Sequence, residues 1–404
     1  MNEKGSNHQL LKQNNHNLIK KFIYRNSPIS RVEIAHQLGL TTATITGMVN
    51  PMISSGLLRE TTAQADETKA AGRPRMMLEF VAEAYYICGV DTGPYRTNYI
   101  LTDLLGNIIA VRRTNQPLGE YQVTLERFAR EIPDFLDETG IPREKILGVG
   151  ICLPGMIDGN ADKIYDIFQD GWTEHSISTE LGERLGLKVE VENNVRARAI
   201  SAELFDRMVK AEPFAYFFVS FGIACQMIID GKVLYGQSAA AGEIGHTVVQ
   251  RNGPVCPTCG NRGCLEALTG ERAILQQCRD IMATDTPTVL KELCRDSNRL
   301  TMDQVLEAQE LGDKAVSQVI EDAIEYLGIA LANTINLISP RSVVLEGRIL
   351  STPTNQERML RIVDQYMFHI HSGMTDFTFL PYDPDRGARA AASVVVKEFL
   401  GRPL

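Results

Sequence analysis

The sequence predicts an α/β protein with a small helical N-terminal domain, two similarly ordered lobes of strands and helices, and a metal-binding loop. Three observations lead to this fold class. The first 60 residues contain apolar side chains at helical spacing, interrupted by turn signals. From about residue 81, apolar strands alternate with helical segments, and the same order begins again at residue 214. Three cysteines lie close together at 256–264.

Size and charge limit the class of protein. A length of 404 residues with 44% hydrophobic side chains predicts two or three domains with well-filled cores. No apolar run approaches the ~20 residues that cross a bilayer, and the polar N-terminus lacks a secretory signal, so we expect a cytoplasmic protein without membrane contact. Residues 1–80 carry a net charge of +4 and the remainder −13, which together give −9. This distribution is expected when only the N-terminal part meets a polyanion.

Residues 1–80 are predicted to form a winged helix-turn-helix domain with its linker. Ser30 and Glu33 have the spacing of a capping box at the start of a short helix, and Gly39 ends that helix. Two short helices joined by a tight turn with glycine are typical of this motif. Three helices and then two strands of a wing are expected at 17–24, 31–38, 41–54, 56–60 and 76–80.

The third of these helices carries short hydroxyl and amide side chains, which suit a helix in the major groove. The segment Gly72-Arg73-Pro74-Arg75 is typical of extended arms that enter a narrow minor groove. A structural helical bundle and a solvated loop are the alternatives for these two features. The predicted DNA-contacting residues are Arg31, Thr41, Thr42, Thr44, Thr46, Asn50, Arg73 and Arg75.

The rest of the chain is predicted to form two lobes, at 81–197 and 198–386, with a C-terminal helix at 387–404 that returns to the first lobe. Their similar order suggests the duplicated ribonuclease-H-like fold of actin-like ATPases and sugar kinases, in which a cleft between the lobes binds ligand. The expected strands are 87–92, 97–103, 108–113, 146–153, 189–192, 214–219, 227–229 and 342–345. The expected helices are 121–139, one that begins at 194, 315–337 and 387–399.

The cysteines at 256–264 predict a metal site. With His246 upstream they form a Cys3His set, the usual closed geometry of structural zinc. Reduced thiols at this spacing favour a metal over a disulfide. The predicted ligands are His246, Cys256, Cys259 and Cys264, and the predicted cofactor is Zn2+. The alternative is that the cysteines are buried free thiols, which we expect for Cys88, Cys152, Cys225, Cys278 and Cys294.

The same stretch carries a family resemblance. Glu243-Ile-Gly-His246, followed by Cys259-Gly-Asn-Arg-Gly-Cys264-Leu-Glu266, resembles the signature of the ROK family, which contains sugar kinases and repressors of the xylose and N-acetylglucosamine class. The resemblance implies that the zinc loop places its histidine and glutamates against sugar hydroxyls, although exposed loop charge is the alternative for the glutamates. The effector-binding residues that it implies are Gly155, Asn193, Asn194, Glu243, His246 and Glu266.

The chain departs from the kinases of this family at every catalytic feature. Where the family has Asp-x-Gly-Gly-Thr, this chain has Asp91-Thr-Gly-Pro-Tyr95, and proline has no N–H for a phosphate. A second, glycine-rich phosphate loop reads Ser220-Phe-Gly-Ile-Ala-Cys-Gln226, and the Gly-Gly beside adenine reads Gly347-Arg348. Asn194 replaces the catalytic Asp, so the base that accepts the sugar proton is missing. These departures predict a non-catalytic protein.

Taken together, the resemblance implies a sequence-specific repressor of carbohydrate-use genes that leaves double-stranded operator DNA when a sugar effector binds. A homodimer or homotetramer is expected, because operator symmetry matches protein symmetry. The alternatives are a sugar kinase with a fused DNA-binding domain, and an activator. Phe168 replaces a family asparagine, which leaves the sugar's identity open, and Trp172 is expected to pack in the core.

Overall fold

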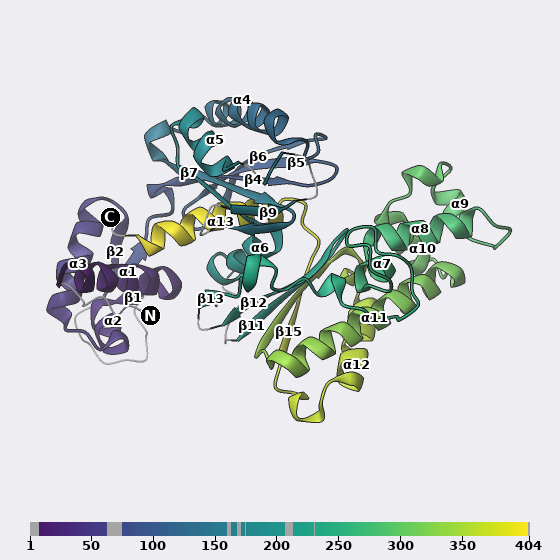
Figure 1. Cartoon of the computed structure of the whole chain (residues 1–404). Helices are drawn as coiled ribbons and strands as arrows, with labels where there is room; N and C mark the ends of the chain where they lie inside the picture. Colours follow the sequence, from purple (N-terminus) through teal and green to yellow (C-terminus); the bar gives the residue numbers. More distant parts are fainter. Residues whose placement is uncertain are drawn as a thin grey trace. The chain divides into compact units, whose positions relative to one another are not determined.

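Two five-stranded mixed sheets with the same arrangement organise the chain. In each, a central strand pairs with an antiparallel strand on one side and a parallel strand on the other (Figure 1). The first sheet has the order β10-β7-β4-β5-β6 and the second has the order β13-β12-β11-β14-β15. The repeated topology explains why the strand and helix pattern of the sequence begins again half-way along the chain.

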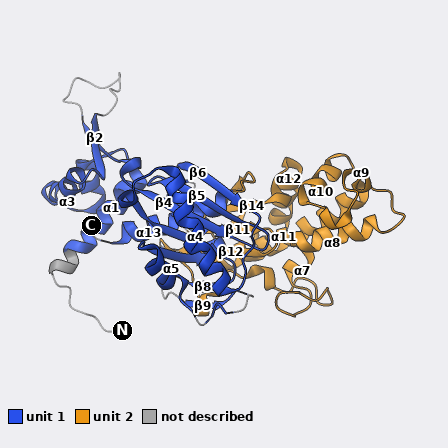
Figure 2. Ribbon diagram, turned by 90° about the horizontal axis from the view of Figure 1, so that it is seen from above, with its two compact units in different colours: residues 1–208, 385–404 blue, residues 209–384 orange. Residues whose placement is uncertain are grey.

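The structure is a computed structural model, and it describes residues 8–62, 75–159, 163–167, 171–173, 175–206, 213–229 and 231–402, without the side chains of 8–11. The chain divides into two compact units (Figure 2). The first contains residues 1–208 and 385–404, and the second contains 209–384. The first unit thus extends beyond the lobe boundary predicted at residue 197. None of the described helices is long and apolar enough to cross a membrane.

The N-terminal part of the first unit, which we call the head, comprises the described residues up to 80. Its elements are α1 (His8–Asn26), β1 (Ile29–Ser30), α2 (Arg31–Leu38), α3 (Thr42–Ser54), β2 (Leu58–Thr62) and β3 (Met76–Phe80). Ser30 and Glu33 form the predicted capping box, and Gly39 ends α2 with φ of 64°. Strand β1 was not predicted, because two residues carry no periodicity. It is defined only by its pairing with β3.

The first lobe contains β4 (Tyr86–Thr92), β5 (Thr97–Asp103), β6 (Ile108–Thr114), α4 (Tyr121–Thr139), β7 (Ile146–Leu153), β8 (Met156–Asp158), β9 (Lys163–Asp166), α5 (Ile177–Leu185), β10 (Val189–Asn193) and α6 (Asn194–Leu204). The predicted strands and helix are present, whereas β8, β9 and α5 were missed. Trp172 is fully buried in the core of this lobe, as expected, and its indole N–H donates to Gly119 O at 3.0 Å.

Helix α13 (Arg386–Gly401) closes the first unit, and it packs on β4 and β7. Glycines in the sheet allow this close approach. A Cβ at Gly89 would lie 2.0 Å from Ala388 O, and one at Gly150 would lie 1.9 Å from Ala391 O. The other end of α13 meets the head, where the fully buried Lys20 donates to Phe399 O and Arg402 O at 2.6 and 2.5 Å. The last helix therefore connects the head to the first lobe.

The second unit contains β11 (Phe214–Val219), β12 (Ile223–Ile229), β13 (Lys232–Val233), α7 (Leu265–Thr269), α8 (Glu271–Met282), α9 (Leu290–Leu293), α10 (Met302–Glu310), α11 (Lys314–Ile338), β14 (Ser342–Gly347), α12 (Pro353–Tyr366) and β15 (Asp376–Leu380). Helix α11 and strands β11, β12 and β14 were predicted. The other helices and β15 were not, although they contribute to the core of this unit.

Candidate functional site

The four predicted metal ligands lie together in the second unit. The donor atoms of His246, Cys256, Cys259 and Cys264 are all within 4.8 Å of one another. Cys259 Sγ is 3.5 Å from Cys264 Sγ, and Cys256 Sγ is 3.7 Å from His246 Nδ1. Three thiols and one imidazole at these separations match the donor set of a tetrahedral structural zinc site. The cluster can therefore hold a metal ion.

Backbone contacts hold the loop of residues 243–266, which we call the metal loop. The N–H of Cys256 donates to Asn261 O at 2.7 Å, and Gly260 N–H returns to Cys256 O at 2.9 Å. Gly263 has φ of 73°, and a Cβ there would lie 1.6 Å from Gln250 O, so only glycine fits. The next residues, Cys264 and Leu265, are fully buried. The loop is consequently anchored in the core of its unit.

The thiols differ in their electrostatic surroundings. Cys259 is exposed, and a hydrogen bond from the Asn261 backbone lowers its pKa, with smaller contributions from the neighbouring thiols. Burial raises the pKa of Cys264 to about 12. Because thiolates bind metal and thiols do not, an ion that enters here must displace the proton of Cys264.

Three of the predicted effector residues lie on or beside the metal loop. The His246 N–H donates to Glu243 O at 3.1 Å, so these residues share one turn. His246 directs Nδ1 toward the thiols, which leaves Nε2 for another contact. Glu266 is the second residue of α7, and its Oε1 accepts from Thr258 Oγ1 at 2.6 Å. The metal loop thus carries two glutamates and a histidine, whose side chains are of the kind that hydrogen-bond hydroxyl groups.

The other three predicted effector residues lie in the first unit: Asn193 and Asn194 where β10 ends and α6 begins, and Gly155 between β7 and β8. Asn193 Oδ1 accepts from the N–H groups of Val195 and Arg196, and its Nδ2 donates to Gly155 O at 2.8 Å. Its amide oxygen therefore serves as a helix cap, and its amide nitrogen joins the cap to Gly155. Asn194 is half-buried, and its side chain makes no hydrogen bond to the described residues.

The turn between β4 and β5, where the sequence departs from the family's first phosphate-loop motif, is closed by hydrogen bonds within the hairpin. Gly93 N–H donates to Arg96 O at 3.1 Å, and Thr92 Oγ1 lies 2.8 Å from Thr97 Oγ1. Burial raises the pKa of Asp91, an effect that Arg198 at 3.9 Å opposes. The Gly93 N–H is thus used within the β4–β5 hairpin.

Residues 220–226 and Arg348, where the sequence also departs from the kinases, form hydrogen bonds with other parts of the chain. Cys225 N–H donates to Gly242 O at 2.8 Å, and the buried Gln226 donates to Leu234 O at 2.8 Å. Arg348 forms two hydrogen bonds with Asp303, at 3.0 and 3.1 Å, and a third with Tyr382 at 2.6 Å. The sequence analysis noted Arg348 but missed both of its partners, which come from distant parts of the chain.

The predicted DNA-contacting residues that are described lie on the head. Thr41 caps α3, accepting from Thr44 N–H at 3.1 Å, while Thr42 and Asn50 are exposed. Arg31, at the start of α2, pairs with Glu60 of β2 and lies 3.5 Å from Asn50 Oδ1. Arg75 lies 3.8 Å from Glu33, and Thr46 is half-buried. Arg73 lies outside the described residues, as does Phe168.

Sequence reasoning missed one ion pair at the core of the first unit. Arg196 and Glu192 are 1% and 2% exposed, and they are joined at 2.8 Å between Nε and Oε1. Glu192 also accepts from Asn193 N–H at 2.8 Å, so the pair supports the turn into α6. The available signal was a Glu and an Arg four residues apart across the start of a helix.

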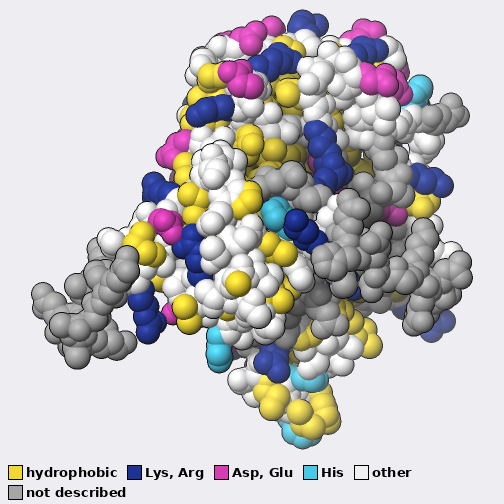
Figure 3. All heavy atoms as spheres, turned by 90° about the vertical axis from the view of Figure 1, so that its left-hand side faces the viewer, with side chains coloured by type: hydrophobic (Ala, Val, Ile, Leu, Met, Phe, Trp, Pro, Cys, Tyr) yellow, Lys and Arg dark blue, Asp and Glu magenta, His cyan; other side chains and the backbone are white. Residues whose placement is uncertain are grey.

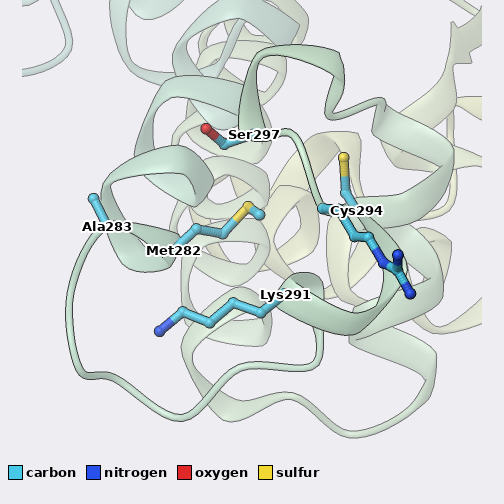
Figure 4. Close-up of a pocket in the computed structure, with 6 residues that line it drawn as sticks. Met282, Ala283, Lys291, Cys294 and Ser297 are labelled. Carbon is cyan, nitrogen blue, oxygen red and sulfur yellow. The ribbon is translucent and has the colours of Figure 1, made fainter.

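A separate hollow of about 200 Å3 lies at the end of α8 (Figure 4). Its lining residues are Met282, Ala283, Lys291, Cys294, Arg295 and Ser297. None of the predicted effector or metal residues contributes to it.

Comparison with known proteins identifies the family. Residues 87–398 match the model of the ROK family, which is most of the chain. This protein belongs to the ROK family. The ROK chain is 28% identical over 393 residues to the xylose repressor of Bacillus subtilis (strain 168), an alignment that covers 96% of this chain and 97% of the repressor. It is 27% identical over 353 residues to the DNA-binding transcriptional dual regulator NagC of Escherichia coli (strain K12), covering 85% and 82%.

Solved structures agree with the fold of this ROK protein. A ROK family transcriptional regulator, described as a homolog of the E. coli MLC protein, has a TM-score of 0.82 at 23% identity, and 97% of each chain is covered. A ROK family glucokinase from Streptomyces griseus in complex with glucose and AMPPNP has a TM-score of 0.64 at 20% identity, covering 76% of this chain and 98% of the kinase. The lobes thus have the mixed α/β fold that sugar kinases and regulators of the family share.

Proposed function

We propose that this ROK protein is a sequence-specific DNA-binding repressor of carbohydrate-use genes, released from its operator by a sugar or sugar derivative. The observation that carries the proposal is the similarity to a xylose repressor over 96% of the chain. That alignment extends well beyond the family match at 87–398, so it includes the head. A cytoplasmic location and a homodimeric or homotetrameric assembly belong to the same proposal.

The geometry of the head supports its assignment as a winged helix-turn-helix. Helices α2 and α3 are joined by a short turn at Gly39, and β2 and β3 form an antiparallel pair like that of a wing. Thr42 and Asn50 expose hydroxyl and amide groups on α3, which suit base edges and phosphates. The remaining predicted contacts, including Arg73, stay part of the proposal.

Zinc is the metal that the Cys3His cluster fits best, because thiolate and imidazole donors in a closed set of four are typical of structural zinc. In this proposal zinc binds His246 through Nδ1 and orders the loop that carries Glu243 and Glu266. The ion would supply rigidity to the effector site rather than chemistry. Gly155, Asn193 and Asn194 complete the proposed set of effector contacts.

The absence of kinase activity is supported by what replaces the nucleotide contacts. Arg348 with its partners Asp303 and Tyr382 stands at the position that the family resemblance assigns to adenine. Gly93 N–H is used in a hairpin turn, and Asn194 cannot accept the proton of a sugar hydroxyl at neutral pH. The site would therefore bind a sugar without phosphorylating it.

A mobility-shift assay on the DNA upstream of the chain's own gene, with a panel of sugars and sugar phosphates, tests the proposal. We expect a shifted complex without sugar and its loss with one member of the panel. Failure to bind this DNA contradicts the repressor assignment. In parallel, labelled ATP and hexoses should yield no sugar phosphate, and phosphorylation would instead support a kinase with a fused DNA-binding domain. A reporter driven by the same upstream DNA would instead indicate an activator if its expression fell when the gene for this protein was deleted.

A further inference from the structure

The described arginines of the head all have carboxylate partners. Arg25 pairs with Glu203, Arg31 with Glu60, Arg59 with Glu79 at 3.2 Å, and Arg75 with Glu33 at 3.8 Å. Figure 3, seen from the side on which Figure 1 draws the head, likewise shows Lys and Arg side chains in small separate groups. A surface that attracts DNA phosphates by charge alone would leave such cations unpaired.

The pair of Arg31 and Glu60 differs from the others in place and in burial. The Arg31 side chain is only 18% exposed, whereas that of Arg75 is 76% exposed. An exposed pair exchanges its partner at little cost, but a partly desolvated one resists exchange. Arg31 also lies 3.5 Å from Asn50 Oδ1, so this pair adjoins the face of α3 that we propose reads DNA.

The position of Arg31 within α2 is unfavourable for the helix itself. Arg31 is the first residue of α2, where the partial positive charge of the helix terminus disfavours a cation. The capping box of Ser30 and Glu33 already supplies the acid that this terminus prefers. A cation beside the terminus is suited to an anionic partner, and in this structure the partner is the carboxylate of Glu60.

We propose that Glu60 is an affinity-limiting residue of the DNA-binding surface, because its carboxylate competes with a DNA phosphate for Arg31. This inference rests on the proposed DNA-binding function. When DNA binds, Arg31 must leave Glu60, and the released carboxylate then faces the phosphates. Every DNA sequence is bound more weakly as a result, which leaves sequence selection to α3 and keeps the complex readily reversible.

The test is a titration of full-length wild type, Glu60→Gln and Glu203→Gln on the promoter duplex and on a scrambled duplex of equal length. Glu60→Gln should bind both duplexes roughly three- to tenfold more tightly, since a partly exposed ion pair no longer opposes binding. Its plot of log K against log salt should be steeper by about 0.9, the contribution of one further phosphate contact. Glu203→Gln is the matched control, because it adds the same charge and frees Arg25 on α1.

The outcomes separate the inference from the function on which it rests. Arg31→Met/Glu60→Gln should lose the gain of Glu60→Gln, and a single cooperative melting transition checks that each variant is folded. An equal gain in Glu60→Gln and Glu203→Gln would reduce the effect to net charge and overturn the inference. Unchanged or weaker binding of a folded Glu60→Gln would also overturn it while wild type still binds. A wild-type protein that does not bind the promoter duplex refutes the proposed function instead.

Discussion

Single residues decide whether the turn between β10 and α6 can form. Arg196 and Glu192 are a buried ion pair whose members also bind the backbone at Ile157 and Asn193. Burying two charges has a large desolvation cost, which this pair offsets by satisfying almost every polar atom that it contains. The pair therefore places Asn193 and Asn194, two of the proposed effector contacts, at the start of α6.

Arg196→Met should destabilise the first unit by about 3–5 kcal/mol, because it leaves the Glu192 carboxylate buried without its partner. Urea unfolding followed by tryptophan fluorescence measures this change, since Trp172 is the sole tryptophan and lies in the core of the first lobe. Arg196→Met/Glu192→Gln, which removes the charge as well, should recover part of the loss. A double variant that is no more stable than the single one would show that packing, and not charge, causes the effect.

Cys259 is the only exposed thiol of the metal cluster, so Cys259→Ser changes metal binding with little effect on packing. We expect the purified variant to lose its zinc, as measured by atomic absorption after dialysis, because an alcohol is a poor zinc ligand. Loss of the ion should loosen the loop that carries Glu266 and abolish the response to sugar. Cys278→Ser, at a buried thiol outside the cluster, is the control and should retain the metal. A wild-type protein prepared without chelator that contains no zinc would contradict the assignment.

At the scale of elements, α13 determines how the first unit holds together. The helix lies against β4 and β7 so closely that glycine is required in both strands, and it then meets α1 of the head. It also packs on α6, and residues at its C-terminal end accept hydrogen bonds from Lys20. This continuity makes α13 the element through which a change in the first lobe can reach the head.

Gly150→Ala should displace α13, because the added Cβ would lie 1.9 Å from the carbonyl oxygen of Ala391, and backbone cannot yield as a side chain does. The expected destabilisation is about 1–3 kcal/mol, measured by urea unfolding. Gly93→Ala, in the turn that follows β4, is the control, since a Cβ there meets nothing within 4 Å. Equal stability of Gly150→Ala and wild type would show that α13 can shift without cost.

At the scale of the whole molecule, the chain combines a head of three helices and a three-stranded sheet with a body that has the fold of a sugar kinase. The proposed effector residues of the metal loop belong to the second unit, whereas the head belongs to the first. In the proposed function, a response of DNA binding to sugar is a coupling free energy between the effector residues and the head. Variants of the sugar contacts should change the response to sugar without changing DNA binding itself.

Glu243→Gln tests this separation. The substitution keeps the size of the side chain but removes its charge, and hydrogen bonds to charged groups contribute about 1.5–3 kcal/mol, so sugar affinity should fall at least about tenfold. Operator binding without sugar should equal that of wild type, which makes the variant a repressor that ignores its inducer. Mobility shifts with and without sugar measure both quantities. Weakened operator binding in the absence of sugar would instead identify Glu243 as a structural residue of the metal loop.

The features that the sequence determined alone are those whose cause lies within a few residues. The capping box of α2, the spacing of the metal ligands and the proline in the first phosphate turn are such features, because each depends on neighbours along the chain. Only the tertiary structure decided which distant groups meet: β1 with β3, Lys20 with the end of α13, Arg348 with Asp303, and Arg31 with Glu60. Side-chain identity specifies charge and shape at each position. The partner of each charge depends on which distant segments the fold brings together, and no local pattern specifies those contacts.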